Sequence, residues 1–259
     1  MGPGAVDLLV EAPELEGPRR AARAALADLP IDVCVQPWDG RRKRLFVADM
    51  DSTIIGCECL DELADFAGVK AQVSAITERA MRGEIAFEGA LRERVAMLKG
   101  MGLDALEKAY AERVRLNPGA RTLVRTLAAG GVRCVLVSGG FSYFTSRVAA
   151  AAGFHAERAN TLGQAEGKLT GTVDEPILGR EAKLAALTEE AAALNAPPSA
   201  TLAIGDGAND LAMIGAAGLG VAYRAKPIVA AEADCAIDHA DLTAVLYFQG
   251  YRAEEFVSG

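Results

Sequence analysis

The sequence predicts an α/β fold, a Rossmann-like parallel sheet with helices on both faces. Two observations predict it: apolar strand-like segments recur along the chain, and helical patterns separate them. Strands that alternate with helices form parallel sheets whose two faces are both covered. The predicted strands are 45–49, 132–138, 200–206, 218–222 and 233–237, and the predicted helices lie near 119–129, 142–152, 179–194, 208–216 and 242–248.

One interval breaks this alternation and predicts a second structural unit. Residues 58–113 show three or four amphipathic helical patterns and no convincing strand. Because this interval follows the first core strand, we expect a small helical cap over the carboxyl ends of the strands. A further segment, 160–174, has two alternating arms around a Glu-Gly pair, which is typical of a β-hairpin.

The N-terminal segment predicts a short βαβ-like unit ahead of the core. Residues 6–12 and 31–37 have the composition of strands, and a helical stretch lies near 18–29. This unit could form only part of a ferredoxin-like unit and is too short to bury a core alone, so it should pack on the main domain or on a second copy. A homodimer could therefore form through it. The predicted division is an N-terminal segment of 1–40, a catalytic core of 41–57 with 114–259, and a helical cap of 58–113.

The composition of the chain narrows its class and its partners. It has 259 residues, of which 51% are hydrophobic, and a formal net charge of -8. Nucleic acid requires a basic face that this charge does not supply, and the basic run at 41–44 is typical of a solvated linker. No stretch reaches the roughly 20 uninterrupted apolar residues of a membrane-spanning helix. We therefore expect a cytoplasmic protein without nucleic-acid or membrane partners, and with cysteines kept as thiols.

Two carboxylates stand at the end of the first core strand. Asp49 and Asp51 follow the apolar run 45–48, and because side chains alternate along a strand, both should point to the same side. At the carboxyl end of a strand in an open parallel sheet, a ligand crevice can form. One carboxylate could attack a substrate while the other handles protons. The alternative is a polar turn, because Asp, Ser and Thr are ordinary turn residues.

Further polar residues follow two other predicted strands. Ser138 and Gly139 come directly after the apolar run 135–137 and are expected to open a helix, as in sites where backbone N–H groups face a phosphate. Asp206 and Asp210 follow another strand, and such oxygen ligands suit a hard cation. Lys183 lies in a predicted helix, between Ser138 and Asp206 in the sequence. Each has an ordinary alternative, namely a turn, a helix N-cap or a solvated lysine.

Taken in order, these elements read Asp-x-Asp-x-Thr, Ser-Gly, Lys and Gly-Asp-x-x-x-Asp, and they resemble the haloacid-dehalogenase-like superfamily. The resemblance covers about residues 45–255, and 49–58 with 81–94 are more narrowly similar to phosphoserine phosphatases. It implies that Asp49 is a nucleophile that forms an aspartyl-phosphate, and that Asp51 is the general acid and base. It also implies Mg²⁺, bound by Asp49, the backbone carbonyl of Asp51, and Asp206.

The same resemblance assigns the phosphate-binding residues. Ser138, Gly139 and Lys183 would offset the charge of the phosphoryl group. Asn209 and Asp210 would orient the phosphate, the lysine and a metal-bound water.

The predicted cap carries residues that would recognise an amino acid. The resemblance implies that Glu58 accepts the substrate ammonium, and that Arg94 clamps its carboxylate with the guanidinium geometry suited to that group. Met81 and Phe87 match positions that shield the site from water. From the sequence alone, all four could instead be exposed helix charges or helix core.

The implied activity is Mg²⁺-dependent hydrolysis of phosphoserine to L-serine and phosphate, the last step of serine biosynthesis. The alternatives are a related phosphatase or phosphotransferase for phosphohomoserine or phosphothreonine, and a non-catalytic scaffold that binds amino acids. The pairing of Glu58 with Arg94 argues against phosphoglycolate, which has no ammonium group.

Overall fold

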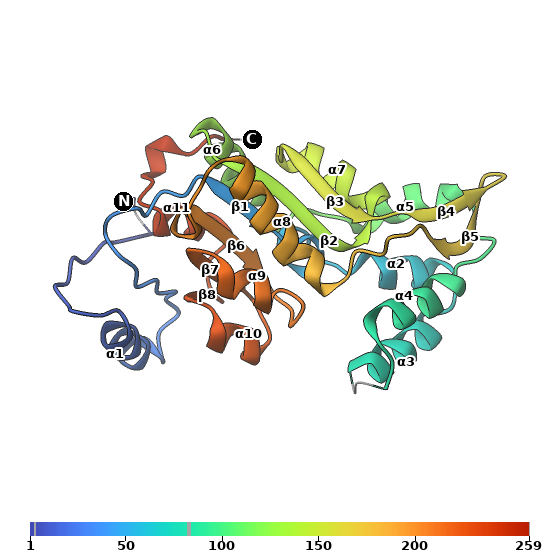
Figure 1. Cartoon of the computed structure of the whole chain (residues 1–259), viewed down its shortest axis with the longest axis horizontal. Helices are drawn as coiled ribbons and strands as arrows, with labels where there is room; N and C mark the ends of the chain where they lie inside the picture. Colours follow the sequence, from blue (N-terminus) through green and yellow to red (C-terminus); the bar gives the residue numbers. More distant parts are fainter. Residues whose placement is uncertain (3, 82–83, 259) are drawn as a thin grey trace.

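The computed structural model describes residues 1–2, 4–81 and 84–258, and these contain the predicted parallel sheet (Figure 1). Its six strands are parallel and lie in the order β3-β2-β1-β6-β7-β8. They are β1 (Leu45–Ala48), β2 (Arg133–Phe141), β3 (Ala156–Asn160), β6 (Thr201–Gly205), β7 (Leu219–Tyr223) and β8 (Cys235–Ile237). The predicted fold class is therefore confirmed.

Strand β1 lies in the interior of the sheet and is buried on both faces. Phe46 and Ala48 pack into the larger hydrophobic cluster, whereas Leu45 and Val47 belong to a second cluster. A parallel strand covered on both faces is apolar at every position, which explains why β1 shows no alternation. Strands β2 and β6 flank it in parallel, so the carboxyl ends of all three strands meet at one edge of the sheet.

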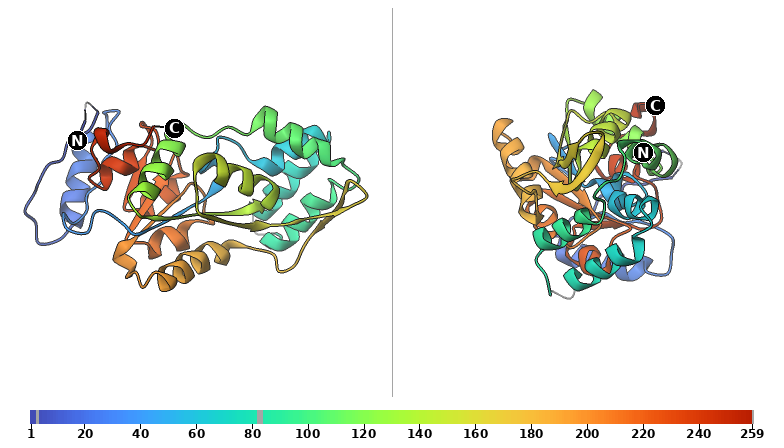
Figure 2. Two further views of the ribbon diagram at one scale, coloured as in Figure 1. Left: turned by 90° about the horizontal axis from the view of Figure 1, so that it is seen from above. Right: turned by 90° about the vertical axis from the view of Figure 1, so that its right-hand side faces the viewer.

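Helices cover both faces of this sheet (Figures 1 and 2). The larger cluster takes side chains from α6 (Ala120–Ala129), α7 (Ser142–Ala152) and α11 (Ala244–Phe248). The second cluster takes them from α8 (Arg180–Ala193) and α9 (Leu211–Ala216). These helices agree with the prediction to within a few residues. The short helix α10 (Pro227–Glu232) was not predicted, because a helix of 6 residues is too short to show a clear hydrophobic periodicity.

The interval 58–113 forms four helices and no strand in its described part. They are α2 (Cys59–Phe66), α3 (Lys70–Met81), α4 (Phe87–Ala96) and α5 (Leu103–Arg113). The predicted hairpin forms from β4 (Leu162–Ala165) and β5 (Lys168–Val173). It joins this helical unit, because Leu169 donates to the Met101 carbonyl (2.9 Å) and Gly100 donates to the Leu169 carbonyl (2.8 Å). Figure 1 shows the helices and the hairpin together beyond the carboxyl edge of the sheet.

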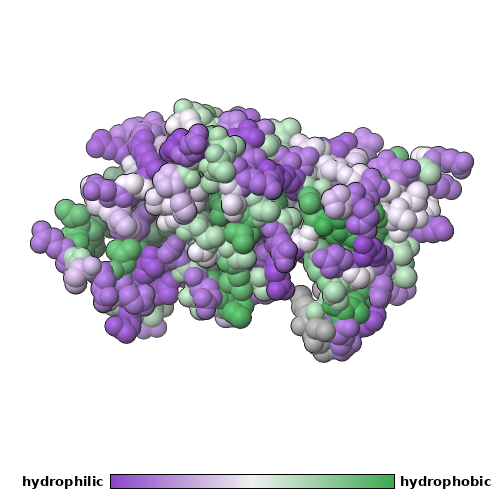
Figure 3. Space-filling model, in the orientation of Figure 1, coloured by the Kyte–Doolittle hydropathy of each residue, from purple (hydrophilic) through white to green (hydrophobic). Residues whose placement is uncertain are grey.

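The strands that we predicted at 6–12 and 31–37 are wrong. Neither segment is a strand, and only the helix between them forms, as α1 (Glu16–Leu26). Val6 and Leu8 are 78% and 81% exposed, and Figure 3 shows apolar surface at this end of the molecule. A strand is stable only when neighbouring strands take up its backbone hydrogen bonds, and neither segment pairs with a strand of the described residues.

Side chains nevertheless fix this segment to the core. Arg19 pairs with Asp234 at 2.6 Å. The Asp32 carboxylate accepts the backbone N–H groups of Asp238 and Ala240, both at 2.8 Å. These contacts reach Asp234, directly before β8, and the loop directly after β8, so the segment is attached beside the edge strand of the sheet.

The sequence analysis also missed β3. Its residues read Ala-Glu-Arg-Ala-Asn, which is polar because β3 is an edge strand and only partly covered. In the described residues, no helix is both long enough and apolar enough to cross a membrane.

Candidate active site

Asp51 joins three segments of the chain at the carboxyl edge of the sheet. It lies in an irregular turn after β1, where Ser52 adopts the left-handed conformation with a φ of 57°. Its carboxylate accepts the Cys59 backbone N–H (2.8 Å) and the Ser138 hydroxyl (3.0 Å). The turn, the first helix of the cap and the end of β2 therefore meet on one carboxylate.

Asp49 belongs to a buried ion cluster. Lys183, in the first turn of α8, donates to Asp49 Oδ1 at 2.7 Å and to Asp210 Oδ1 at 2.5 Å. Asp49 is 5% exposed, Lys183 is 3% exposed and Asp210 is fully buried. A buried ammonium without partners would be strongly destabilising, and the two carboxylates compensate its charge. Lys183 is thus not a solvated lysine.

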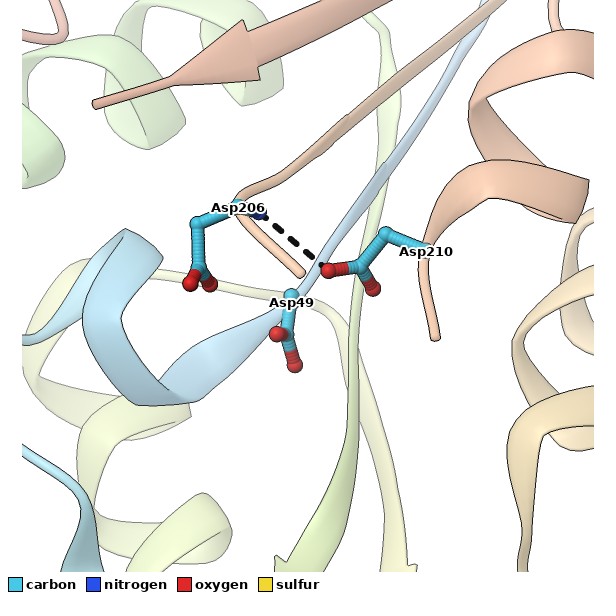
Figure 4. A group of neighbouring side chains, drawn as sticks. All are labelled: Asp49, Asp206 and Asp210. Carbon is cyan, nitrogen blue, oxygen red and sulfur yellow. Dashed lines mark hydrogen bonds between the residues drawn. The ribbon is translucent and has the colours of Figure 1, made fainter. Parts of the chain in front are cut away.

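Asp206 completes an acidic group with Asp49 and Asp210 (Figure 4). One carboxylate oxygen of each lies within 4.8 Å of the others. The Thr53 hydroxyl donates to Asp206 Oδ1 (3.1 Å), and Asp210 Oδ2 accepts the backbone N–H groups of Asp206 (3.2 Å) and Gly207 (3.0 Å). Three carboxylates without sulfur or imidazole suit a hard divalent cation, so the residues present fit such an ion.

Burial controls the electrostatics of these carboxylates. Burial and the repulsion of Asp210 raise the pKa of Asp49 well above its usual range, although Lys183 opposes the shift. Burial also raises the pKa of Asp51, although the hydrogen bonds that Asp51 accepts oppose this shift. The pKa of Asp206 is raised by burial and by repulsion from Asp210. Burial lowers the pKa of Lys183, but attraction by Asp49 and Asp210 outweighs it and holds the pKa above the usual value. A bound cation would favour the ionised carboxylates.

The end of β2 is held by a residue that sequence reasoning missed. Asn160, at the end of β3, is 2% exposed. Its side-chain amide donates to the carbonyls of Gly139 (2.9 Å) and Leu178 (3.1 Å) and accepts the Leu178 N–H (2.7 Å). The Ser138 hydroxyl in turn accepts the Gly140 N–H (2.8 Å). A single Asn in a polar segment carries no sequence signal of burial, so only the fold identifies it.

Glu58 lies at the entrance to the cap, directly before α2. Its carboxylate accepts the Ser52 hydroxyl at 2.6 Å. Burial, followed by repulsion from Asp51, raises the pKa of Glu58 to about 7. A carboxylate that is repelled by other carboxylates favours a cationic partner.

Arg94 lies on α4 and is half-buried. Its guanidinium donates to the Ala90 carbonyl (3.2 Å) and to the Thr77 hydroxyl (3.5 Å). Burial lowers the pKa of Arg94, whereas attraction by Asp61 and Glu58 opposes the shift. Arg94 and Glu58 are therefore electrostatic neighbours. The side chain of Met81 lies outside the described part of the structure.

The cap reaches the core through Phe87. A small cavity of about 10 Å³ is lined by Phe87 from α4 and by Gly139, Lys183 and Asn209 from the core, with Gly179 and Arg180 beside them. This volume is too small for a substrate, so the cap is closed on the core. The fold has thus brought together predicted residues that lie more than a hundred positions apart in the sequence.

Comparison with known proteins gives a consistent assignment. A model of the haloacid dehalogenase-like hydrolases matches residues 46–215. The phosphoserine phosphatase of Polaromonas sp. is 48% identical over 208 residues, which cover 78% of this chain and 88% of that protein. The phosphoserine phosphatase of Streptomyces coelicolor is 44% identical over 253 residues, 97% of this chain but only 62% of the relative, so this chain spans less than two thirds of that protein.

A solved structure agrees with these relatives. The phospho-aspartyl intermediate analogue of a phosphoserine phosphatase is 38% identical and superimposes with a TM-score of 0.73, over 80% of this chain and 99% of that one. The family match spans β1, the cap and the segments that carry Lys183 and Asp210. The chain therefore belongs to the haloacid dehalogenase-like hydrolase family.

Proposed function

We propose that this hydrolase converts O-phospho-L-serine to L-serine and phosphate through an aspartyl-phosphate on Asp49. The observation that carries the proposal is the buried cluster in which Lys183 bridges Asp49 and Asp210. Relatives that match most of this chain are phosphoserine phosphatases, and one solved structure represents a phospho-aspartyl intermediate. Both findings support the same chemistry.

The first step forms a bond between an Asp49 oxygen and phosphorus while the bond from phosphorus to the serine oxygen breaks. The serine alkoxide is a poor leaving group unless it receives a proton, and Asp51 supplies one. Its burial favours the protonated form, as the raised pKa of Asp51 indicates. Lys183 and the N–H groups near Ser138 and Gly139 offset the charge that gathers on the phosphoryl oxygens.

The second step releases phosphate and restores the enzyme. Asp51, now ionised, takes a proton from a water molecule, whose oxygen attacks phosphorus. The bond between phosphorus and the Asp49 oxygen then breaks. Asp49 recovers its carboxylate and Asp51 its proton, so both residues are ready for another turnover.

We assign the divalent cation to Mg²⁺, held by Asp49, the backbone carbonyl of Asp51, and Asp206. When bound, it would offset the negative charges of the nucleophile and the phosphoryl group. Asp210 also belongs to the acidic group, but its two oxygens are engaged with Lys183 and with backbone N–H groups. Asp210 therefore acts by orienting Lys183 and the loop, as the sequence resemblance implied.

Glu58 and Arg94 would recognise the amino acid. The ammonium group of phosphoserine would meet the Glu58 carboxylate, and the substrate carboxylate would meet the Arg94 guanidinium in a charge-assisted pair. Phosphothreonine and phosphohomoserine carry the same two groups, so they are the closest alternative substrates. Met81 and Phe87 would exclude water from the closed site.

Three further expectations accompany this function. Residues 58–113 would act as a mobile cap on a core formed by 41–57 and 114–259. The N-terminal segment 1–40 would mediate pairing of two copies. The enzyme would work in the cytoplasm on a small molecule.

The function is tested by phosphate release from a panel of small phosphate esters. Phosphoserine should be turned over with the highest kcat/KM, and chelation of the divalent cation by EDTA should abolish activity, because the acidic group then repels the phosphoryl group. Added Mg²⁺ should restore it. Higher kcat/KM for phosphohomoserine or phosphothreonine would assign the alternative substrate, and no release from any ester would indicate a scaffold.

Arg94→Ala should damage recognition of the substrate carboxylate. We expect KM for phosphoserine to rise about tenfold or more, because a charge-assisted pair is lost. Turnover of an aryl phosphate, which has no carboxylate, should change little. Arg92→Ala is the matched control: Arg92 lies on the same helix but pairs with Glu175 on the surface, at 2.5 Å, and an exposed pair contributes little. Equal damage by both variants would contradict the role of Arg94.

The pH profile tests Glu58. Because the ionised form binds the ammonium group and the pKa of Glu58 is raised to about 7, kcat/KM for phosphoserine should fall as the pH drops through about 7. The pH profile for an aryl phosphate should lack this acid limb, which is the fall in kcat/KM at low pH. Glu58→Gln should lower kcat/KM for phosphoserine at high pH and remove the limb. A wild-type limb that persists unchanged in the variant would assign it to another group.

A further inference from the structure

A second cavity, of about 450 Å³, lies where the cap joins the core, and none of its lining residues belongs to the proposed active site. Its volume falls within the roughly 300–1,000 Å³ of typical ligand pockets. The walls come from the end of α5, the linker to α6, the start of α6, and α7. The lining residues include Tyr110, Val114, Arg115, Asn117, Arg121 and Thr122.

This cavity adjoins the hinge between cap and core. The chain passes from core to cap after Ile54 and returns through the linker between α5 and α6, which Figure 2 shows running from one unit to the other. The two passages are hydrogen-bonded: Asn117 donates its N–H to the Ile54 carbonyl (2.8 Å), and Gly56 donates to the Arg115 carbonyl (3.2 Å). Arg115 and Asn117 therefore line the cavity and hold the hinge.

The hinge is also bonded to the turn that carries the catalytic carboxylates. The side-chain amide of Asn117 donates to the Thr53 carbonyl at 2.8 Å. The Thr53 hydroxyl in turn donates to Asp206 in the acidic group. A shift in the cavity wall can therefore reach the active site through two hydrogen bonds.

The cavity concentrates positive charge in an acidic protein. Arg115 donates to the Val114 carbonyl (2.8 Å) and Arg121 to the Ala151 carbonyl (3.0 Å). Neither guanidinium forms an ion pair with a carboxylate of the described residues, and no acidic residue lines the cavity. The chain as a whole has a net charge of -8. Two guanidiniums without carboxylate partners favour an anionic ligand.

We propose that this hinge cavity binds a short-chain dicarboxylate, one carboxylate at each guanidinium. Arg115, on the linker, and Arg121, on α6, are exposed and line the same cavity, so each can pair with one carboxylate of the ligand. A zwitterionic amino acid is disfavoured, because no lining carboxylate would accept its ammonium group.

The ligand would act on the cap. It contacts Tyr110 and Val114 at the cap end of the cavity and Arg121 and Thr122 on the core, so it binds most tightly when the two units lie as they do in this closed structure. Occupancy would thus favour closure and slow opening. This inference concerns a site separate from the proposed phosphatase site, and it stands whether or not phosphoserine is the substrate.

Calorimetric titration with succinate at constant ionic strength tests the site. The whole chain should bind succinate, and the double variant Arg115→Gln/Arg121→Gln should weaken binding about tenfold or more, through loss of charge-assisted pairs. Arg147→Gln, on α7 outside the cavity, is the matched control and should bind like the wild type. Arg94→Ala should also bind normally, which separates this site from the active site.

Several results would overturn the proposal. They are no binding by the wild type, binding that the double variant retains, or binding that Arg94→Ala abolishes. Tighter binding of methylphosphonate than of succinate through Arg115 and Arg121 would refute the dicarboxylate. Hydrogen exchange supplies a second readout: succinate should slow exchange at 54–56 and 114–117 in the wild type and in Arg147→Gln, and not in the double variant. Unchanged exchange in the wild type would also contradict the proposal.

Discussion

The site depends on one buried interaction, in which the Lys183 ammonium lies between the carboxylates of Asp49 and Asp210. Removing such charges from water costs several kcal/mol per ion, and close pairing with further hydrogen bonds offsets that cost. Asp210 supplies these bonds through the backbone of the loop after β6. Lys183 in turn opposes the burial and the Asp210 repulsion that raise the pKa of Asp49. The same arrangement fixes the loop, the first turn of α8 and Asp49 in one geometry.

The sheet makes this interaction possible. Three parallel strands end at one edge, so their following loops deliver carboxylates and hydroxyls to one place, and the cap closes over them through Phe87. The two passages between core and cap are hydrogen-bonded to each other beside the turn that carries Asp49 and Asp51. The turn after β1, the two connections between cap and core, and the hinge cavity are therefore all joined through the backbone around Thr53 and Asn117.

The sequence predicted what depends on local pattern. The strand ends carrying Asp49, Ser138 and Asp206 follow continuous apolar runs, and the helices are periodic, so both could be read directly. The role of Asn160 and the attachment of the predicted hairpin to the cap could not be read directly, because both depend on partners distant in sequence. The strands at 6–12 and 31–37 were predicted wrongly because apolar alternation does not supply a neighbouring strand.

The covalent role of Asp49 is tested most directly by mass spectrometry of peptides from enzyme quenched in acid during phosphoserine turnover. We expect phosphate on the peptide that contains Asp49 in the wild type. It should accumulate in Asp51→Asn if hydrolysis is slowed more than attack, and it should be absent in Asp49→Asn. An active enzyme with no phosphorylated peptide in any state, or with phosphate on a peptide that lacks Asp49, would contradict this covalent role.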